Sequence, residues 1–194
     1  MRFHKGLAAA LAFVGTPAAI HAQVVDPGAH IAAYDDAIVA IMKQKLGLSA
    51  RVDRFENLVR DYYDMPAIAQ LVVGPKWAAS SAADRSAATA ALTHHSAVQL
   101  ARNFKAFDGE KFVVDPNVIS RGASRIVRVT IVSRGGKDLL LYQLRQSGSG
   151  WKIVDVISGG VSQLAVQRSD AAAIVAGGGA AALAQRLAKL DAVK

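Results

Sequence analysis

The sequence contains no cysteine among its 194 residues. The chain can therefore form no disulfide, carries no thiol nucleophile and offers no sulfur ligand to a metal. Its histidines lack metal-binding spacing as well, because His94 and His95 are adjacent and neither has a second His four residues away. We expect a protein without metal or cofactor, whose fold depends on its core alone.

Long uncharged hydrophobic runs are also missing beyond the first residues. No later stretch approaches the roughly 18 apolar residues of a membrane-spanning helix. At the start, two basic residues precede an uncharged apolar run over residues 6–14 and a small-residue segment that ends at Ala22. This order is typical of a secretory signal peptide. We therefore expect residues 1–22 to be cleaved near Ala22 from an exported protein, and residues 23–194 to form a single domain.

Positive charge is in excess but is scattered. The chain carries 23 Lys and Arg residues against 15 Asp and Glu, a net charge of +8. The blocks of like charge that mark nucleic-acid-binding tails are missing. A scattered excess favours anionic surfaces, such as lipid headgroups or an acidic protein. We expect no nucleic-acid partner.

Apolar residues recur at helical spacing through the first half of the chain. The clearest pattern covers residues 51–63, which have a charged opposite face, and another helix is expected over residues 29–46. Asp64 can cap a short following helix. A capping box opens a long helix over residues 81–106. The inward stripe of this helix has unusually small side chains and includes Ala87, Ala91, Val98 and Ala101.

After Asp108-Gly109 the apolar period changes from helical to two. Short glycine-rich turns join consecutive strands, which favours an antiparallel meander. Two C-terminal helices, residues 161–176 and 180–193, are separated by Gly177-Gly178-Gly179. This order predicts an α+β fold, a four-stranded twisted antiparallel sheet with helices packed on one face. The expected strands cover residues 111–119, 124–133, 138–146 and 151–158.

Two stretches of the chain carry a resemblance to a known family. The first is Tyr63-Asp64-Met65, then Ile68-Ala69 and Gly74-Pro75-Lys76-Trp77. The second is Trp151-Lys152-Ile153-Val154-Asp155-Val156, then Gly160-Val161-Ser162 and Arg168. In order and spacing they resemble the MlaC-type periplasmic lipid-binding proteins, also called toluene-tolerance auxiliary proteins. The residues 165–170 are most similar to the hopanoid-biosynthesis-associated HpnM branch.

The resemblance implies a periplasmic carrier without catalytic activity. Such a protein holds a lipid, a hopanoid or a phospholipid, in an apolar cavity between sheet and helices. It shuttles the lipid between the inner and outer membranes and exchanges it with membrane-bound transporter components. We expect it to act as a monomer.

A carrier of this kind needs an apolar cavity for physical reasons. Exposing a lipid costs roughly 0.8 kcal/mol per CH₂, on the order of 20 kcal/mol for two acyl chains. Small side chains would leave room in a core that is otherwise filled to crystal density. The alanines of the long helix could equally allow close packing of helix and sheet, and the resemblance favours the groove. The candidate cavity residues are Leu71, Val72, Ala87, Ala91, Val98, Ala101, Val127, Val129, Ile131, Leu140, Tyr142, Leu144, Ile153 and Leu164.

Arg168 shares a helical face with apolar residues, where a guanidinium needs a partner. Asp155, in the last strand, is the nearest candidate in sequence. Two interpretations stay open. The two residues form an ion pair that fixes strand to helix, or Arg168 stands at the cavity mouth and binds a lipid phosphate or another anionic headgroup.

Two other functions are compatible with this sequence. One is an enzyme in a cone-shaped fold of the nuclear-transport-factor kind, with Asp155 or a histidine as acid or base. The other is a basic periplasmic interaction module without a ligand cavity. The sequence contains no convincing pair of titratable groups, so we expect no catalytic residue.

Overall fold

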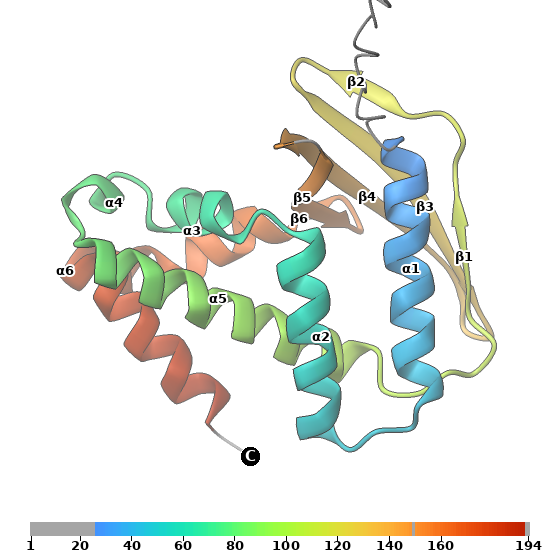
Figure 1. The fold of residues 1–194 in the computed structure, drawn as a ribbon, viewed down its shortest axis with the longest axis horizontal. Helices are drawn as coiled ribbons and strands as arrows, with labels where there is room; N and C mark the ends of the chain where they lie inside the picture. Colours follow the sequence, from blue (N-terminus) through green and yellow to red (C-terminus); the bar gives the residue numbers. More distant parts are fainter. Residues whose placement is uncertain (1–25, 149, 193–194) are drawn as a thin grey trace, which may run out of the picture.

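The computed structural model describes residues 26–148 and 150–192. The expected signal peptide, residues 1–22, lies outside the described residues. The rest forms a mixed α+β fold in which an antiparallel sheet stands beside a group of helices (Figure 1). The helices are α1 (Pro27–Lys43), α2 (Leu48–Tyr62), α3 (Met65–Val73), α4 (Lys76–Ala79), α5 (Ala82–Asn103) and α6 (Gln163–Asp191).

Side chains at the helix ends explain where these helices begin and end. An oxygen of Asp64 accepts from the Ala67 amide at 3.2 Å, and Oγ of Ser81 accepts from the Asp84 amide at 3.1 Å. Both contacts confirm the caps predicted for α3 and α5. At the other end of α5, the buried Arg51 guanidinium donates to the carbonyl oxygens of Ala101 and Lys105 at 2.8 and 3.2 Å. These carbonyls have no partner inside the helix, which ends at Asn103 rather than near residue 106.

The sheet contains six strands, not the four that the sequence predicts. Its order is β1-β3-β4-β5-β6, β2 also pairs with β3, and all pairs are antiparallel. The expected first strand is divided because an Asp115 side chain accepts from the Asn117 amide at 2.8 Å, and Pro116 has no N–H for the ladder. The strands are β1 (Lys111–Val114), β2 (Ile119–Arg121), β3 (Ser124–Ser133), β4 (Gly136–Ser147), β5 (Gly150–Ser158) and β6 (Val161–Ser162).

The last helix starts later than predicted and is interrupted. Gly159 and Gly160 both have positive φ and turn the chain into the short β6. Ser162 then caps α6 by accepting from the Ala165 amide at 3.0 Å. Gly178 and Gly179 depart from helical geometry, so the predicted break is confirmed. By length and composition α6 is the one described helix that could cross a membrane, but the break divides it into segments shorter than the roughly 20 residues required.

Two apolar clusters form the core. The first joins the inner face of the sheet to α1, α2 and the end of α5. The second joins α3 and α6 to the beginning of α5. Figure 1 shows the same division, with the sheet and α1 on one side and α3, α4 and α6 on the other. Tyr63 and Leu100 are partly buried and pack against both clusters, so they mark the junction.

Candidate functional site

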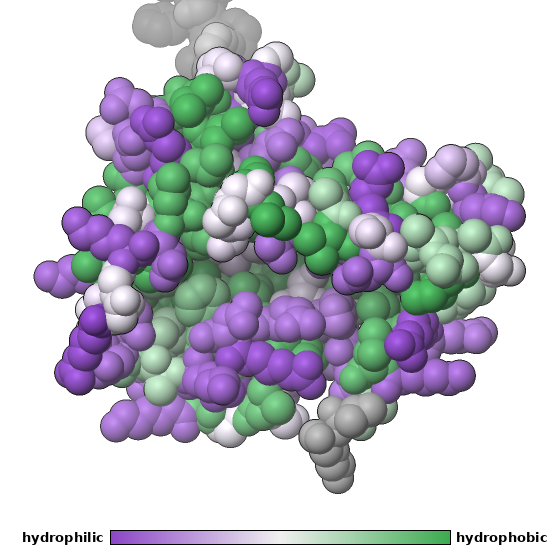
Figure 2. Space-filling view, turned by 180° about the vertical axis from the view of Figure 1, so that it is seen from behind, coloured by the Kyte–Doolittle hydropathy of each residue, from purple (hydrophilic) through white to green (hydrophobic). Residues whose placement is uncertain are grey.

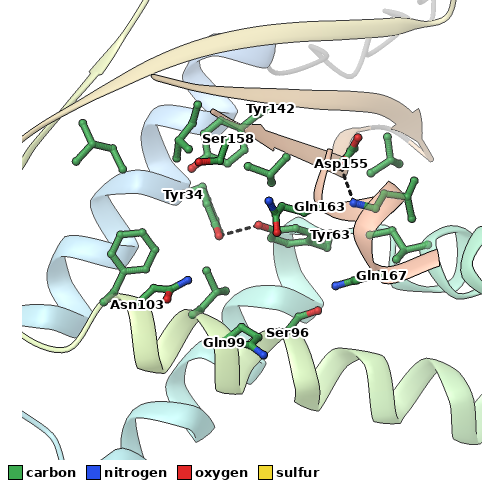
Figure 3. A pocket seen from close by; sticks show the side chains of 18 of the residues that line it. Tyr34, Tyr63, Ser96, Gln99, Asn103, Tyr142, Asp155, Ser158, Gln163 and Gln167 are labelled. Atoms are coloured by element: carbon green, nitrogen blue, oxygen red, sulfur yellow. Dashed lines mark hydrogen bonds between the residues drawn. The ribbon is translucent and has the colours of Figure 1, made fainter. Parts of the chain in front are cut away.

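A pocket lies at this junction, between the strands β3–β5 and the helices α5 and α6 (Figure 3). Its volume of about 480 Å³ is in the range of roughly 300–1,000 Å³ found for small-molecule sites. Seen from behind, the molecule is hollowed near its middle, with hydrophilic residues along one rim (Figure 2). We call the pocket between β3–β5, α5 and α6 the central pocket. It is lined by Tyr34, Tyr63, Ile68, Ser96, Gln99, Leu100, Asn103, Phe104, Ile131, Asp138, Leu140, Tyr142, Val154, Asp155, Val156, Ser158, Gln163, Leu164 and Gln167.

Aliphatic side chains form opposite walls of the central pocket. The sheet contributes Ile131, Leu140 and Val156, and the helices contribute Leu100 and Leu164. All five are only partly buried, although four of them also pack against the core clusters. Their remaining surface faces water when the pocket is empty, which is unfavourable for apolar groups. An apolar ligand would remove that surface from water.

Three tyrosines from different elements meet in the pocket wall (Figure 3). The hydroxyl oxygens of Tyr34 and Tyr63 are 2.9 Å apart, and the rings of Tyr34 and Tyr142 meet edge to face at 5.8 Å. Burial raises the pKa of Tyr63 to about 12 and the pKa values of Tyr34 and Tyr142 well above their ordinary value. The three hydroxyls therefore stay protonated at neutral pH and act as neutral hydrogen-bonding groups.

A buried carboxyl group stands behind this cluster. Oδ1 of Asp35 accepts a long hydrogen bond of 3.4 Å from the Tyr142 hydroxyl, and the residue is 2% exposed. Its other oxygen, Oδ2, has no hydrogen-bond partner among the described residues. Burial, the largest cause, raises the pKa of Asp35 to about 7. Asp35 does not line the central pocket, so it acts on a ligand only through Tyr142.

The two sequence motifs meet beside the central pocket, although they are far apart in the chain. Tyr63 forms a parallel bridge with Ile153 of β5, and the Asp64 amide donates to the Ile153 carbonyl at 2.9 Å. This contact ties the α2–α3 junction to the sheet. It also fixes the Tyr63 ring in the pocket wall. The motifs thus build the junction between the two core clusters.

The structure gathers only part of the predicted cavity residues into the central pocket. Ile131, Leu140, Tyr142 and Leu164 line it. Two more, Leu71 and Val72, line a separate groove of about 570 Å³ between the end of α3 and α6. The other predicted residues of the sheet and two of α5 are buried in the first core cluster, namely Val98, Ala101, Val127, Val129, Leu144 and Ile153.

The small-residue stripe of α5 does not face the central pocket. Ala87 is exposed, and Ala91 is partly buried against the second core cluster. Ala101 of the stripe is fully buried, as are Ala88 and Ala97 outside it, which lets neighbouring elements approach closely. The face of α5 that lines the pocket consists of Ser96, Gln99, Leu100 and Asn103.

The expected contact between Asp155 and Arg168 is not formed. Oδ1 of Asp155 accepts from the Leu164 amide at 3.0 Å, and Oδ2 accepts from the Ser162 hydroxyl at 2.6 Å. The carboxylate is thus satisfied by the start of α6. Arg168 is exposed and lines the α3–α6 groove, and no ion pair joins it to Asp155 within the described residues. The predicted ion pair is therefore wrong. Arg168 does not line the central pocket, and its binding to a lipid headgroup stays a prediction.

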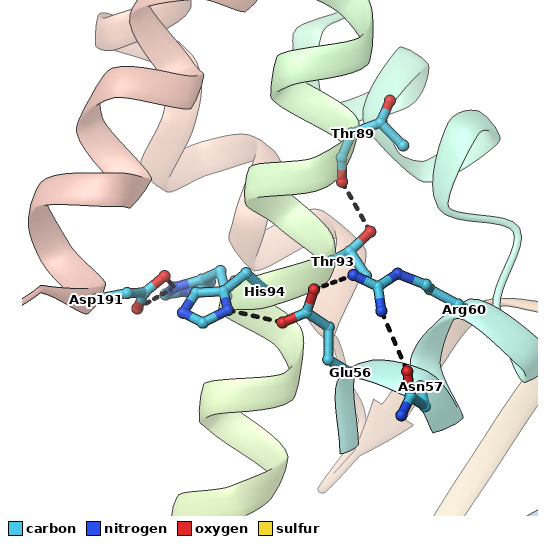
Figure 4. A network of polar contacts seen from close by, with 8 residues as sticks. Glu56, Asn57, Arg60, Thr89, Thr93, His94 and Asp191 are labelled. Atoms are coloured by element: carbon cyan, nitrogen blue, oxygen red, sulfur yellow. Dashed lines mark hydrogen bonds and ion pairs between the residues drawn. The ribbon is translucent and has the colours of Figure 1, made fainter. Parts of the chain in front are cut away.

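The adjacent histidines of α5 bind different carboxylates (Figure 4). Nδ1 of His94 lies 2.9 Å from Oε2 of Glu56, and Nδ1 of His95 lies 3.0 Å from Oδ1 of Asp191. These contacts connect α5 to α2 and to the end of α6. In the part of the chain that the structure describes, no group of three His, Asp or Glu side chains could hold a metal ion. The histidines have a structural role.

Sequence reasoning missed most of the polar residues of the central pocket. Gln99 and Asn103 look like the solvent-exposed face of α5, and Gln163 and Gln167 look like that of α6. Periodicity identifies a polar face but not the concave surface that it borders. Tyr63 was detectable, because it belongs to the first motif.

Together, these features define a class of protein, a mixed α+β fold with a pocket of aliphatic and polar side chains between an antiparallel sheet and helices. A model of the MlaC protein family matches residues 32–189, and the chain belongs to this family. A solved structure of a phospholipid-binding protein from Ralstonia solanacearum, in complex with a phospholipid, is similar, with a TM-score of 0.72. The match has 18% identity and covers 87% of this chain and 98% of that chain, which shows the shared fold. Among curated proteins the comparison finds no match.

Proposed function

We propose that this chain is a periplasmic lipid carrier that binds the apolar part of a lipid in the central pocket. The observation that carries this proposal is the pair of aliphatic walls, from the sheet and from α5 and α6, at the junction of two core clusters. Family membership and the fold shared with a phospholipid-binding protein support it.

Transport follows from the energetics of lipid transfer. A lipid crossing water unprotected would expose its chains at roughly 0.8 kcal/mol per CH₂. A pocket of apolar side chains lowers that cost without making release impossible. The carrier would exchange its lipid with transporter components in the inner and outer membranes. We further propose that it acts as a monomer, exported by the N-terminal signal peptide.

The proposed lipid is a phospholipid or a hopanoid. The phospholipid is supported by what the structurally similar protein binds. The hopanoid rests on the similarity of residues 165–170 to the HpnM branch, which stays a prediction. A rigid fused-ring lipid requires a wider pocket than flexible acyl chains do. The amount of each lipid that the purified protein binds therefore distinguishes the two candidates.

Native mass spectrometry of the purified protein tests the proposal. Lipid that copurifies with the unaltered chain supports a carrier, whereas an empty protein contradicts it and favours an interaction module. In Ser96→Trp an indole enters the pocket wall, and we expect it to exclude most of the lipid. Ser86→Trp places the same group on an exposed part of α5 and should leave the lipid content unchanged.

The structure gives no support to a reaction at the central pocket. Asp155 is engaged by the start of α6, and the three tyrosine hydroxyls stay protonated. Asp35 has a pKa near neutrality but does not line the pocket. We therefore propose binding and transport rather than catalysis.

A further inference from the structure

Two grooves meet on the outer face of α3, away from the central pocket. One is the α3–α6 groove. The other, of about 470 Å³, lies between α3 and the edge of the sheet where β3 and β5 begin and β4 ends, and we call it the α3–sheet groove. Leu71 lines both grooves and is 42% exposed, so it forms the wall between them. The opposite face of α3 lines the central pocket through Ile68.

Four basic side chains line these two grooves. Lys76 and Arg168 line the α3–α6 groove, and Arg125 and Arg145 line the α3–sheet groove. In the part of the chain that the structure describes, no Asp or Glu lines either groove. A concave surface with charge of one sign attracts a partner of the opposite sign.

The cations of the α3–α6 groove are free to bind such a partner. Lys76 and Arg168 are exposed, and neither forms an ion pair among the described residues. Both belong to the two sequence motifs, yet neither lines the central pocket. Lipid binding in that pocket therefore leaves these two side chains without a role.

The cations of the α3–sheet groove are also largely uncompensated. The Arg125 guanidinium lies over the ring of Trp151, 5.4 Å from its centre, and donates to carbonyl oxygens at the β2–β3 turn. These contacts hold the side chain in place without neutralising its charge. Nε of Arg145 lies 3.7 Å from the nearest Asp64 oxygen, too far for a hydrogen bond.

The floor of the α3–α6 groove is apolar. Val72 and Val175 are buried there, and Pro75 and Ala172 are exposed beside them. The small Ala172 leaves room for an apolar side chain from outside. Exposed apolar surface with a charged rim is typical of protein–protein interaction sites.

The shape of this surface favours a protein segment over a membrane. A flat bilayer surface can neutralise the cations, but it does not fill grooves on both sides of Leu71. A peptide can place apolar side chains in the grooves and carboxylates at the guanidinium groups, which bind carboxylates in bidentate fashion. We propose that the α3–α6 and α3–sheet grooves dock an acidic amphipathic segment of a protein partner. This docking does not depend on lipid binding in the central pocket.

Selection from a library of random peptides tests the proposal. The library, displayed on phage, contains peptides of about 16 residues, which is more than four helical turns. Salt of about 0.15 M screens the general attraction of a basic protein to acidic peptides. Peptides that also bind the double variant Lys76→Glu, Arg168→Glu are removed. We expect the remaining peptides to be enriched in Asp and Glu next to apolar residues.

Single variants then locate the binding of the selected peptides, with fluorescence anisotropy as the measurement. Lys76→Glu and Arg168→Glu should each weaken binding by roughly tenfold. Leu71→Ala removes the apolar wall between the grooves and should weaken binding by a similar factor. Arg54→Glu makes the same change of charge on the exposed face of α2 and should leave the affinity unchanged. All four positions are exposed, so the variants should fold.

The outcomes separate this inference from the proposed function. Selected peptides without acidic enrichment overturn the docking, and so does an affinity that Arg54→Glu lowers as much as Arg168→Glu does. Failure to select any peptide overturns it as well. Sedimentation of the protein with dioleoyl phosphatidylglycerol vesicles that Arg168→Glu abolishes would then assign the surface to a membrane. The lipid content of Arg168→Glu, measured by native mass spectrometry, should match that of the unaltered chain in every case.

Discussion

At the scale of single residues, Asp35 has the most unusual environment. Its carboxyl group is 2% exposed, one oxygen lacks a partner among the described residues, and burial raises its pKa to about 7. Between about pH 4 and pH 7 the folded state therefore keeps a proton that the unfolded chain has released. It follows that this group stabilises the fold at low pH and that the stabilisation is lost as the pH rises through 7.

Asp35→Asn removes the ionisation and with it this part of the pH dependence. Urea unfolding at pH 5 and pH 8 measures the effect. Between these pH values the unaltered chain should lose about 2–3 kcal/mol of stability relative to the variant. The exposed neighbour gives the control, and Asp36→Asn should follow the unaltered chain. Parallel pH profiles for all three proteins would show that Asp35 is ionised in the folded state.

Asp155 and Arg168 provide a second test, because their predicted ion pair is replaced by a helix cap. Asp155→Ala removes the acceptor for the Leu164 amide and the Ser162 hydroxyl, and it should cost about 1–3 kcal/mol of unfolding free energy. Arg168→Ala changes an exposed side chain and should stay within about 0.5 kcal/mol. Denaturant unfolding measures both variants. Similar losses of unfolding free energy in the two would support the ion pair between Asp155 and Arg168 over the helix cap.

The difference between these residues shows what a sequence reveals at this scale. The caps at Asp64 and Ser81 were predictable because each side chain contacts an amide three residues away. The partners of Asp155, the Ser162 hydroxyl and the Leu164 amide, are also close in sequence. The sequence nevertheless led us to pair Asp155 with the charged Arg168 rather than with the start of α6. Contacts such as Tyr34 with Tyr63 join distant elements and have no local signal.

At the scale of secondary structure, the sequence predicted the helices well and the ends of the sheet poorly. Alternating apolar residues located β3, β4 and β5, since these strands have one buried face. The division of the expected first strand arises at Asp115 and Pro116, where the ladder is interrupted. The short β6 has too few residues for any periodicity.

The break in α6 involves two glycines, Gly178 and Gly179, and a Cβ on Gly178 would lie 2.8 Å from Cβ of Ala182. Gly179 has a φ of +61°, and a Cβ there would lie 3.3 Å from Oγ of Ser80. Gly179→Ala should therefore destabilise the protein by about 1–2 kcal/mol. At Gly177 a Cβ would meet nothing within 4 Å, so Gly177→Ala should be neutral or stabilise by about 0.5–1 kcal/mol. Thermal unfolding measures the stability of both variants. Equal changes for Gly179→Ala and Gly177→Ala would argue against a helix break at Gly179.

At the scale of the whole molecule, the pocket is a consequence of two cores that meet without merging. The sheet with α1 and α2 forms one, and α3 with α6 forms the other. The MlaC-type motifs predicted a cavity between sheet and helices, and they join at Tyr63 and Ile153. Periodicity could not predict which face of α5 borders the pocket, because the rotation of a helix relative to its neighbours is set by packing.

The central claim is that a lipid occupies the junction between these two cores. A crystal structure of the protein with its copurified lipid tests it most directly. We predict density for an apolar chain among Leu100, Leu140 and Leu164, with the polar end near Asn103 and Gln163. Lipid density confined to the groove between α3 and α6, or a central pocket closed by its own side chains, would contradict this account.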